Sequence, residues 1–423
     1  MSSVFNRSNF PDKELLQAAS SFGTPAYLYS QKVLEETASE ALRFSAPYGL
    51  TVRYAMKALP SAAILRIFTA KGLGIDASSG YEVLRAERAG IPSRNITLTA
   101  QELPEFFTEL IERGVSFNAC SLHQLESFGT HFNGRSVGVR FNPGLGSGHA
   151  NRVNTGGPAS SFGIWHEHVA EVKRLAGKHS LTVERIHSHI GAGTDPEVWV
   201  HCARLTLAMA AQFETATTVS LGGGFKVARM PDETPADLRK IGSAVKEEIE
   251  KFESSYGRKL HLEIEPGTYL TANAGVVISK IIDISDTGSN GYKFLKVDAG
   301  MTEVLRPSLY GAQHPMWSVP LGGSAQGGGD YLVVGHCCES GDILTPAPSN
   351  PEGLLPRRFS QPAIGDLLII GACGAYCAGM PAKNYNSFPE APELLLESSG
   401  GIRMIRKRQT LDQMLQNEQC SPN

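Results

Sequence analysis

Eight short apolar segments lie between residues 50 and 264, and they constrain the fold of this chain more than any other feature. Most of them are rich in Val and Ile, and longer helix-like stretches separate many of them. This alternation is typical of parallel strands joined by helical crossovers, so it predicts an α/β chain with a closed (β/α)8 barrel. The predicted strands are residues 50–56, 73–77, 95–99, 115–119, 136–141, 183–190, 218–221 and 260–264.

The pattern changes after about residue 275, where a second, mainly β domain is expected. Strand-like segments follow one another there, separated by Gly, Asn, Ser and Pro clusters. A chain of 423 residues is also too long for one compact barrel. We predict a barrel at residues 26–275 and a β domain built from 1–25 and 276–423, in which 321–329 and 346–358 form excursions. The first 25 or so residues could lend a helix and a strand to this β domain. The predicted strands of this domain are 275–282, 292–297, 331–334, 366–370, 393–396 and 402–405.

Composition and charge exclude several function classes. The formal net charge of −3, with both signs interspersed, gives no footprint for nucleic acid or an acidic membrane. No apolar run approaches the roughly 20 residues of a spanning helix, and residues 1–13 lack the apolar core of a secretory signal. Seven scattered cysteines, an odd number, fit reduced thiols, so we expect a cytoplasmic protein. Cys373 and Cys377 lack nearby histidines, which argues against a zinc site.

Residues able to do chemistry follow several of the predicted barrel strands. Because active sites of such barrels lie where the strands end, one chamber would receive an amine, an imidazole, carboxylates and free backbone amides. The strand ends carry Lys57, Asp76, Asn142, His189, the glycines 222–224 and Glu265.

Lys57 closes a strand as apolar as Tyr54-Ala55-Met56, so we expect its side chain to be buried. Burying an ammonium without a partner is costly, and chemistry often explains such an exception. A desolvated lysine can form a Schiff base with a carbonyl, which is how pyridoxal phosphate is held. The alternative, a lysine whose head reaches solvent at the barrel mouth, stays open from this residue alone.

The glycines 222–224 and Glu265 suggest further contacts to a phosphorylated ring. Three glycines ending a strand offer amides to a phosphate, although glycines also end strands for turn reasons. A carboxylate at the end of the eighth strand, before Pro266 and Gly267, could pair with a pyridine nitrogen. Capping of the following turn is the alternative role of this carboxylate.

His187 and His189 are two residues apart on one predicted strand, so both side chains should face the barrel interior. His189, nearer the strand end, is the candidate to lie against a flat cofactor ring, and His187 is expected to be a satisfied structural histidine. Metal ligation by this pair is disfavoured because the sequence nearby supplies no third His or Cys.

A thiol and two carboxylates lie together in the β domain at residues 338–342, of sequence CESGD. A thiol beside carboxylates is not activated as a nucleophile, so Cys338 suits a proton-donor role better than covalent catalysis. A turn with a buried small thiol is the inert alternative.

Seven ordered motifs make this chain resemble the diaminopimelate decarboxylases, which belong to the alanine-racemase-like, fold-type III class of pyridoxal-phosphate enzymes. The resemblance covers nearly the whole chain, and residues 142–144 and 384–386 also fit it. The motifs are YAMKA (54–58), HSHIG (187–191), GGG (222–224), EPG (265–267), RPSLY (306–310), CESGD (338–342) and GAY (374–376).

The resemblance implies that the barrel residues bind pyridoxal 5′-phosphate. Lys57 would hold the cofactor covalently, His189 would stack on its ring, and Glu265 would hold the pyridine nitrogen. The phosphate would be received by Gly222, Gly223, Gly224, Gly267, Thr268 and Tyr376.

The resemblance also implies that residues of the β domain meet the substrate. Cys338 would reprotonate the substrate carbon after carbon dioxide leaves. In this family the segments bearing Cys338 and Glu339 enter the site of the partner subunit, so the active unit would be a homodimer with composite sites. No metal is expected in this site. The distal end of the substrate would meet Arg306, Tyr310, Glu339 and Tyr376.

Three departures from the family pattern bear on the substrate. Thr268 stands where the family has an arginine after Glu-Pro-Gly, and a hydroxyl cannot replace a bidentate cation. Ala192 replaces a serine near the phosphate, and Phe388 lies where the family has an arginine-containing stretch.

We therefore expect a carboxy-lyase of lysine biosynthesis that converts meso-diaminopimelate to L-lysine, with D-lysine, D-ornithine or a related amino acid as alternative substrates. Racemisation is disfavoured because alanine racemases place an arginine against the pyridine nitrogen and so weaken the electron sink. A catalytically inactive relative that acts only by binding is disfavoured because Lys57, His189 and Cys338 are all present.

Overall fold

The computed structural model describes residues 3–146, 156–322 and 328–419, and the chain forms two compact units. The barrel unit comprises Leu34–Val227 and Thr234–Leu270. The β unit comprises Met1–Val33, Ala228–Glu233 and Thr271–Asn423. The chain thus enters the β unit three times, and the short return at residues 228–233 was not expected from the sequence.

Eight parallel strands close into a ring in the barrel unit, as predicted. Each strand pairs in parallel with its two neighbours, and the ring closes because β5 pairs β6 and β10 pairs β2. The short strand β7 (Ile164–Trp165) adds to β6 outside the ring. In ring order the strands are β2 (Leu50–Ala55), β3 (Gly74–Ala77), β4 (Ile96–Leu98), β5 (Ser116–Ala119), β6 (Ser136–Asn142), β8 (Thr182–His187), β9 (Thr218–Ser220) and β10 (His261–Ile264).

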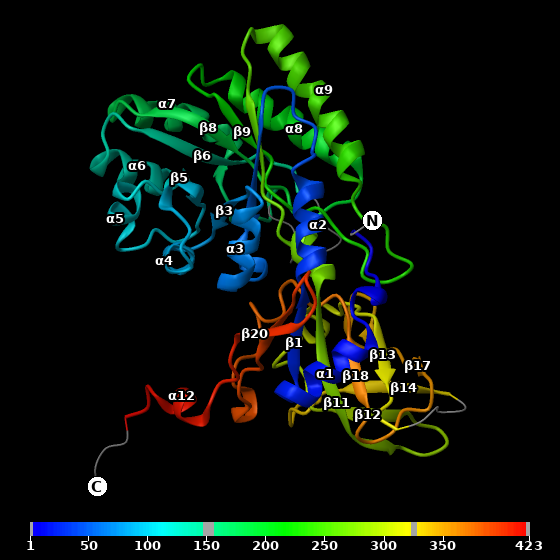
Figure 1. The fold of residues 1–423 in the computed structure, drawn as a ribbon. Coiled ribbons are helices and arrows are strands. Elements are labelled where there is room, and N and C mark those ends of the chain that lie inside the picture. Colours follow the sequence, from blue (N-terminus) through cyan, green and yellow to red (C-terminus); the bar gives the residue numbers. More distant parts are fainter. Residues whose placement is uncertain (1–2, 147–155, 323–327, 420–423) are drawn as a thin grey trace. The chain divides into compact units, whose positions relative to one another are not determined.

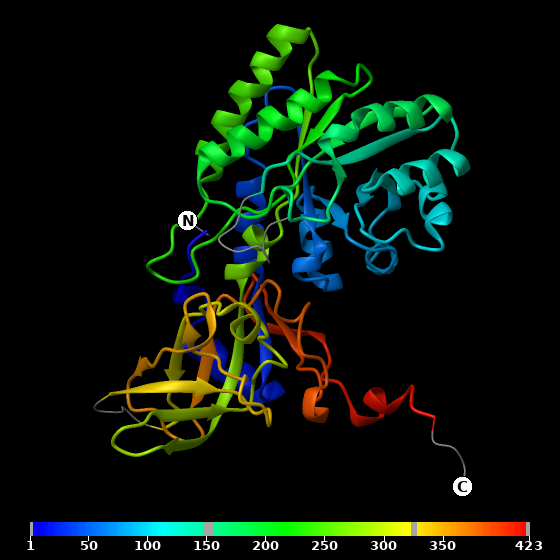
Figure 2. The ribbon, with the colours of Figure 1, turned by 180° about the vertical axis from the view of Figure 1, so that it is seen from behind.

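Helices connect these strands, and polar caps at their first turns explain where several of them begin. Ser79 accepts the amide of Glu82 at the start of one helix, and Asp195 caps another before Pro196. Figures 1 and 2 both show α8 and α9 side by side. The helices are α2 (Gln31–Ala41, which begins in the β unit), α3 (Ala62–Ala70), α4 (Gly80–Arg88), α5 (Phe107–Glu112), α6 (Leu122–His131), α7 (Val169–Lys178), α8 (Pro196–Ala211), α9 (Leu238–Tyr256) and α10 (Thr268–Thr271).

The barrel interior contains a buried ion network on three strands. Glu263 on β10 lies between two arginines, with its Oε1 2.9 Å from Arg53 Nη2 on β2 and its Oε2 3.0 Å from Arg185 Nε on β8. β10 ends at Ile264, so Glu265 lies one residue beyond the strand and two residues after Glu263. The network therefore lies one layer below the strand ends that carry the candidate site.

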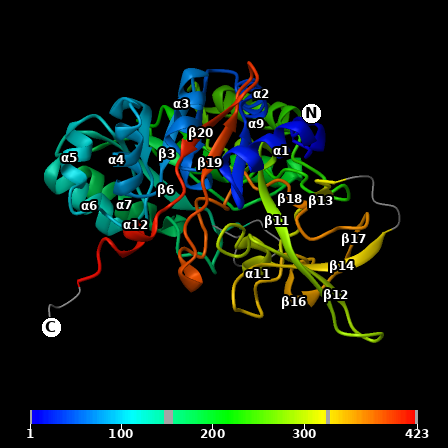
Figure 3. The same ribbon diagram turned by 60° about the horizontal axis from the view of Figure 1, so that its bottom comes forward.

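The β unit contains all six strands predicted after residue 275, together with the N-terminal strand β1 and four strands that were not predicted. The long strand β11 pairs with β1, β12 and β18, and Figure 3 shows it running through the unit. The sheet runs in the order β17-β14-β12-β11-β1-β19-β20, with β18 between β11 and β13. The strands are β1 (Ala26–Ser30), β11 (Gly275–Asp286), β12 (Lys293–Val297), β13 (Met316–Val319), β14 (Gly329–Val334), β15 (Pro346–Ala347), β16 (Asn350–Leu354), β17 (Arg357–Phe359), β18 (Leu367–Ile370), β19 (Glu393–Leu396) and β20 (Ile402–Arg406).

Strand β1 belongs to this sheet, which agrees with an N-terminal strand lent to the β domain but moves the start of the barrel beyond the predicted residue 26. It pairs antiparallel with β11 and parallel with β19, because its apolar residues pack into the core of the β unit. Helix α1 (Asp12–Phe22) packs on the same core through Leu15 and Ala18. The remaining helices of the unit are α11 (Arg306–Tyr310) and α12 (Leu411–Leu415).

The two predicted excursions have different outcomes. Within 321–329, residues 323–327 lie outside the described residues, and Gly329 already begins β14. The segment 346–358 is not a plain excursion, because β15 and β16 pair antiparallel there and β17 begins at Arg357. Among the described residues, no helix combines the length and the apolar character needed to cross a membrane.

Candidate active site

Glu265 is the centre of a buried polar cluster at the ends of three neighbouring barrel strands. Its Oε2 lies 2.9 Å from His187 Nε2 at the end of β8, and its Oε1 accepts the hydroxyl of Ser220 from β9 at 2.9 Å. Burial tends to raise the pKa of Glu265, but His187 and Ser220 outweigh burial and hold it well below its usual value. The carboxylate is therefore ionised at neutral pH and oriented from both sides.

A second carboxyl at the strand ends has the opposite protonation state. Burial, and after it the negative charge of Glu265, raises the pKa of Asp76 on β3 to about 8 against the opposing charge of Lys57. The Oδ1 of Asp76 has no hydrogen-bond partner within the described residues. Two carboxyl groups pushed to opposite states are typical of catalytic sites, because one accepts while the other donates a proton.

The two histidines of the HSHIG motif do not lie on one strand, which corrects the prediction. Strand β8 ends at His187, so His189 lies in the following loop. Ser188 faces away from the barrel interior and bonds Thr206 of α8 at 2.6 Å. His187 was expected to be a satisfied structural histidine, and within the described residues its Nε2 has a partner in Glu265 while its Nδ1 has none.

His189 is half-buried and uncharged at neutral pH. Its pKa lies well below the usual value because of desolvation, followed by the positive charges of Lys57 and Arg140. A Cβ placed on Gly222 would come within 2.7 Å of the Cβ of His189, so this glycine leaves the space that the histidine occupies. An uncharged imidazole beside this loop suits contact with a flat ring.

Gly223 and Gly224 lie so close to neighbouring backbone that no side chain fits. A Cβ on Gly223 would lie 2.1 Å from the carbonyl oxygen of Glu265, and one on Gly224 would lie 1.6 Å from that of Gly191. The amide of Gly222 donates to Ser220 Oγ at 3.3 Å. Within the part of the chain that the structure describes, the amides of Gly223 and Gly224 have no hydrogen-bond partner. This cradle offers two free donors to an anion.

Lys57 is exposed, so the expectation that it is buried is wrong. Strand β2 ends at Ala55, and the single helical turn Met56–Ala58 carries the lysine out of the packed layer while Met56 and Ala58 stay buried. The ammonium lies close enough to Asp76 and His189 to shift the pKa of each. Lys57 therefore belongs to the same cluster of charges despite its exposure.

The other strand-end residues of the barrel unit have local roles. Asn142 Oδ1 accepts the amides of Gly144 at 3.1 Å and Gly157 at 2.8 Å, so Asn142 anchors the loop after β6. Gly267 is buried and Thr268 begins α10, directly after the EPG motif.

In the β unit, Arg306 is held by a buried histidine. Its Nη1 lies 2.8 Å from His314 Nε2, and His314 Nδ1 lies 2.9 Å from the carbonyl oxygen of Gly371. Because a carbonyl only accepts, Nδ1 carries the proton and Nε2 accepts from the guanidinium. The pKa of His314 lies well below its usual value because of burial, followed by the charges of Arg306 and Arg229. The neutral imidazole orients Arg306 without cancelling its charge.

Tyr310 and Tyr376 complete the β-unit residues predicted for ligands, together with Cys338 and Glu339. Tyr310 ends α11, one turn after Arg306. Tyr376 is half-buried and adopts φ +57°, a left-handed conformation that proteins retain mainly at functional sites. Cys338 and Glu339 are exposed in the loop after β14.

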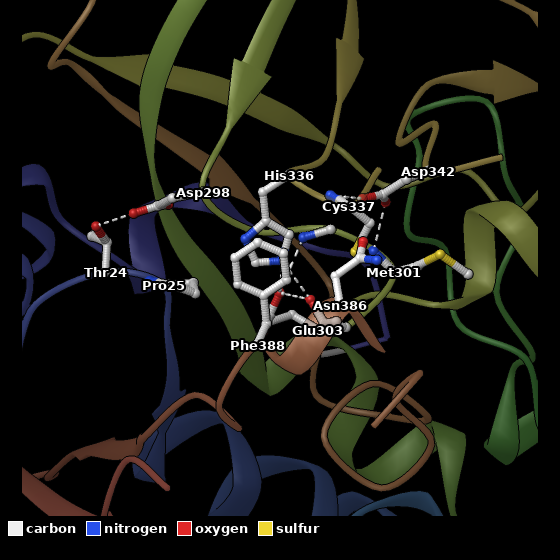
Figure 4. A network of polar contacts seen from close by, with 12 residues as sticks. Thr24, Pro25, Asp298, Met301, Glu303, His336, Cys337, Asp342, Asn386 and Phe388 are labelled. Atoms are coloured by element: carbon white, nitrogen blue, oxygen red, sulfur yellow. Dashed lines mark hydrogen bonds and ion pairs between the residues drawn. The ribbon is translucent and has the colours of Figure 1, made fainter. Parts of the chain in front are cut away.

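A network of polar contacts surrounds this cysteine loop (Figure 4). Asp342 accepts the amides of Met301 at 2.6 Å and Cys337 at 3.0 Å, which ties the base of the loop. Burial lowers the pKa of His336 to about 4, and its ring stacks on Phe388 at 3.6 Å. Phe388, one of the departures from the family pattern, is therefore a packing partner inside the β unit.

Sequence reasoning assigned no site role to His187 as a partner of Glu265, nor to Ser220, His314 or Asn386. The spacing of His187 and Glu265, each at the end of a predicted strand, was a signal that could have paired them. Ser220 and Asn386 contact residues 45 and 48 positions away, whereas His314 lies eight residues after Arg306. The match of residues 384–386 to the family was a signal for Asn386.

Comparisons with known proteins show the family to which the chain belongs. A family model described as "Pyridoxal-dependent decarboxylase, pyridoxal binding domain" matches residues 33–272. The chain is 34% identical over 415 residues to the diaminopimelate decarboxylase of Streptomyces coelicolor, covering 96% of this chain and 91% of that protein. It is 31% identical over 418 residues to that of Escherichia coli K12, covering 95% and 96%. A crystal structure of a diaminopimelate decarboxylase matches with a TM-score of 0.90 at 30% identity, over 97% of each chain.

Proposed function

Because the chain belongs to the diaminopimelate decarboxylase family of pyridoxal-phosphate-dependent enzymes, we propose that it decarboxylates meso-diaminopimelate to L-lysine. The observation that carries the proposal is Glu265, a buried carboxylate kept ionised by His187 and Ser220 beside the free amides of the glycine cradle. This donor set fits pyridoxal phosphate, which needs an anionic partner for its pyridine nitrogen and amides for its phosphate. When bound, the cofactor supplies a sink for the electrons left by departing carbon dioxide.

The residues of the barrel unit bind and orient the cofactor. Glu265 holds the proton on the pyridine nitrogen, because a carboxylate with a depressed pKa leaves that proton on its partner. Lys57 provides the amine that holds the cofactor covalently, and its exposure leaves it accessible. His189, uncharged, contacts the ring face. The phosphate is received by the free amides of Gly223 and Gly224, and Gly222, Gly267, Thr268 and Tyr376 are the further residues of the phosphate site.

The residues of the β unit handle the substrate and the proton. Arg306, oriented by His314, pairs with the distal carboxylate. Cys338 delivers the proton from its Sγ to the substrate carbon, and Glu339 and Tyr310 bind the distal end of the substrate. We place Cys338 and Glu339 in the site of the partner subunit, so the active unit is a homodimer. The free thiols of the six described cysteines support a cytoplasmic location.

A substrate without the second carboxylate, such as D-lysine or D-ornithine, is the second candidate. Two observations favour it. Thr268 supplies no guanidinium, and Phe388 is engaged in the stack on His336 rather than in a polar contact. Arg306 favours meso-diaminopimelate, because a carboxylate is its natural bidentate partner.

The test is an assay of the purified protein with pyridoxal phosphate and a panel of amino acids, following carbon dioxide release and the chirality of the product. Preferred turnover of meso-diaminopimelate to L-lysine supports the first candidate, and preferred turnover of D-lysine or D-ornithine supports the second. Racemisation without carbon dioxide would overturn both. Lys57→Ala should abolish turnover and the visible absorbance of the lysine-bound cofactor while leaving a folded protein.

The composite site has a separate test. Mixing inactive Lys57→Ala with inactive Cys338→Ala should restore up to about a quarter of the activity, since freely exchanging subunits would form heterodimers with one intact site. No recovery despite demonstrated subunit exchange would place both residues in the same subunit.

A further inference from the structure

The loop that carries Cys338 and Glu339 is tied at its base, whereas Cys338 itself is exposed. Gly335 donates its amide to the carbonyl of Asp342 at 2.9 Å, and Asp342 donates to the carbonyl of Glu339 at 3.1 Å. These bonds close the loop but do not reach the backbone of Cys338. A thiol on such a loop needs another contact to hold a defined position.

One distant segment of the β unit, Asn384 to Phe388, supplies that contact. Asn386 Oδ1 accepts the amide of Cys338 at 2.7 Å, and the hydroxyl of Tyr385 donates to Glu339 Oε2 at 3.3 Å. The ring of Phe388 stacks on His336 with an interplanar angle of 8°. The contacts thus run in opposite chain directions along the two segments, and Figure 4 shows Asn386 and Phe388 beside the cysteine loop.

The backbone of this segment has an unusual shape that suits the contact. Asn384, Asn386 and Ser387 have φ values of +57°, +49° and +61°, in the left-handed region that non-glycine residues rarely adopt. Asn384 Nδ2 holds the shape by donating to the carbonyl of Phe388 at 2.9 Å and to Gln409 Oε1 at 2.6 Å. Asparagine tolerates this conformation better than most residues, and such strain persists where the surroundings require it.

We infer that Asn386 is a positioning residue, which fixes the Cys338 thiol through its hydrogen bond to the Cys338 amide. The inference rests on the proposed function, in which Cys338 delivers the proton. The rate of proton transfer falls steeply when the thiol is displaced, because the thiol must lie within hydrogen-bond distance of one face of one carbon. Substrate binding depends on Arg306 and should change less.

Three variants test this role. Asn386→Gly removes the acceptor and keeps a residue at ease in the left-handed conformation, whereas Asn386→Asp keeps an acceptor oxygen at the same place. Ser387→Gly is the matched control, because it removes an exposed hydroxyl from the neighbouring left-handed residue. The readouts are hydrogen exchange of the Cys338 amide in the full-length holoenzyme, and kcat and KM for its best substrate.

We expect Asn386→Gly to speed exchange of the Cys338 amide by roughly tenfold and to lower kcat by about 10- to 100-fold with KM changed less. Asn386→Asp should keep amide exchange and kcat close to the wild-type values, and Ser387→Gly should match wild type in both. Unchanged exchange in Asn386→Gly would overturn the inference, as would faster exchange with unchanged kcat. Failure of the proposed function is distinguishable, because it would show as wild-type inactivity on every amino acid tested.

Discussion

Replacing Glu263 with glutamine should strongly destabilise the barrel unit. Its carboxylate is 4% exposed and lies between the guanidiniums of Arg53, 10% exposed, and Arg185, 9% exposed. Glutamine keeps the size of the side chain but removes the negative charge that two buried cations share. Removing one partner of a buried ion pair costs about 3–5 kcal/mol, because the remaining charge is left uncompensated.

This loss translates into a large shift in thermal stability. A change of 1 kcal/mol moves Tm by about 2–4 °C in a unit of roughly 150–250 residues, so we expect a decrease of about 6–20 °C. Differential scanning calorimetry would measure the shift in Tm, and urea titration would measure the free energy of unfolding.

Glu87→Gln is the control. Glu87 bonds Arg113 through both oxygens, at 3.1 and 3.0 Å, but the two side chains are 20% and 40% exposed. Its loss should cost only about 0.2–1 kcal/mol, the range for exposed pairs. If Glu263→Gln were no more destabilising than Glu87→Gln, the reasoning that the network carries uncompensated buried charge would be refuted.

Three further outcomes follow from particular residues. Gly224→Ala should cost about 3 kcal/mol or more in urea titration and abolish cofactor binding, because its Cβ would lie 1.6 Å from the oxygen of Gly191 at φ +98°; a stable variant that binds cofactor would contradict this. Burial raises the pKa of Glu303 from 4.5 to about 7, so the folded state keeps a proton that the unfolded state loses. The free energy of unfolding should therefore fall by up to about 3 kcal/mol as pH rises from about 4.5 to 7. Glu303→Gln should remove this pH dependence, and identical pH profiles of Tm in wild type and variant would contradict the prediction. Thr268→Arg should shift the kcat/KM ratio towards meso-diaminopimelate over D-lysine by about 1–3 kcal/mol, unless wild type already favours it strongly through Arg306 alone.

Much of the architecture was visible in the sequence because the strands of a closed parallel barrel are buried on both faces. Such strands appear as continuous apolar runs, and each of the eight predicted runs overlaps a barrel strand. Strand ends are also visible, which is why Glu265 and the glycines 222–224 were identified before the structure. The start of the barrel was placed at residue 26, just before β1, because an apolar run alone does not say which of two sheets will pair with it.

The sequence by itself thus determined the two-unit composition, the barrel and the ordered motifs of the family. Only the tertiary structure decided how the site residues are held. Glu265 meets Ser220, 45 residues away, and His187, 78 residues away, because the register of β8, β9 and β10 aligns their ends. Asn386 reaches Cys338, 48 residues away, through a left-handed backbone that no periodic pattern marks. These contacts depend on non-local pairing and loop conformation, whereas hydrophobic periodicity records only which residues each element buries.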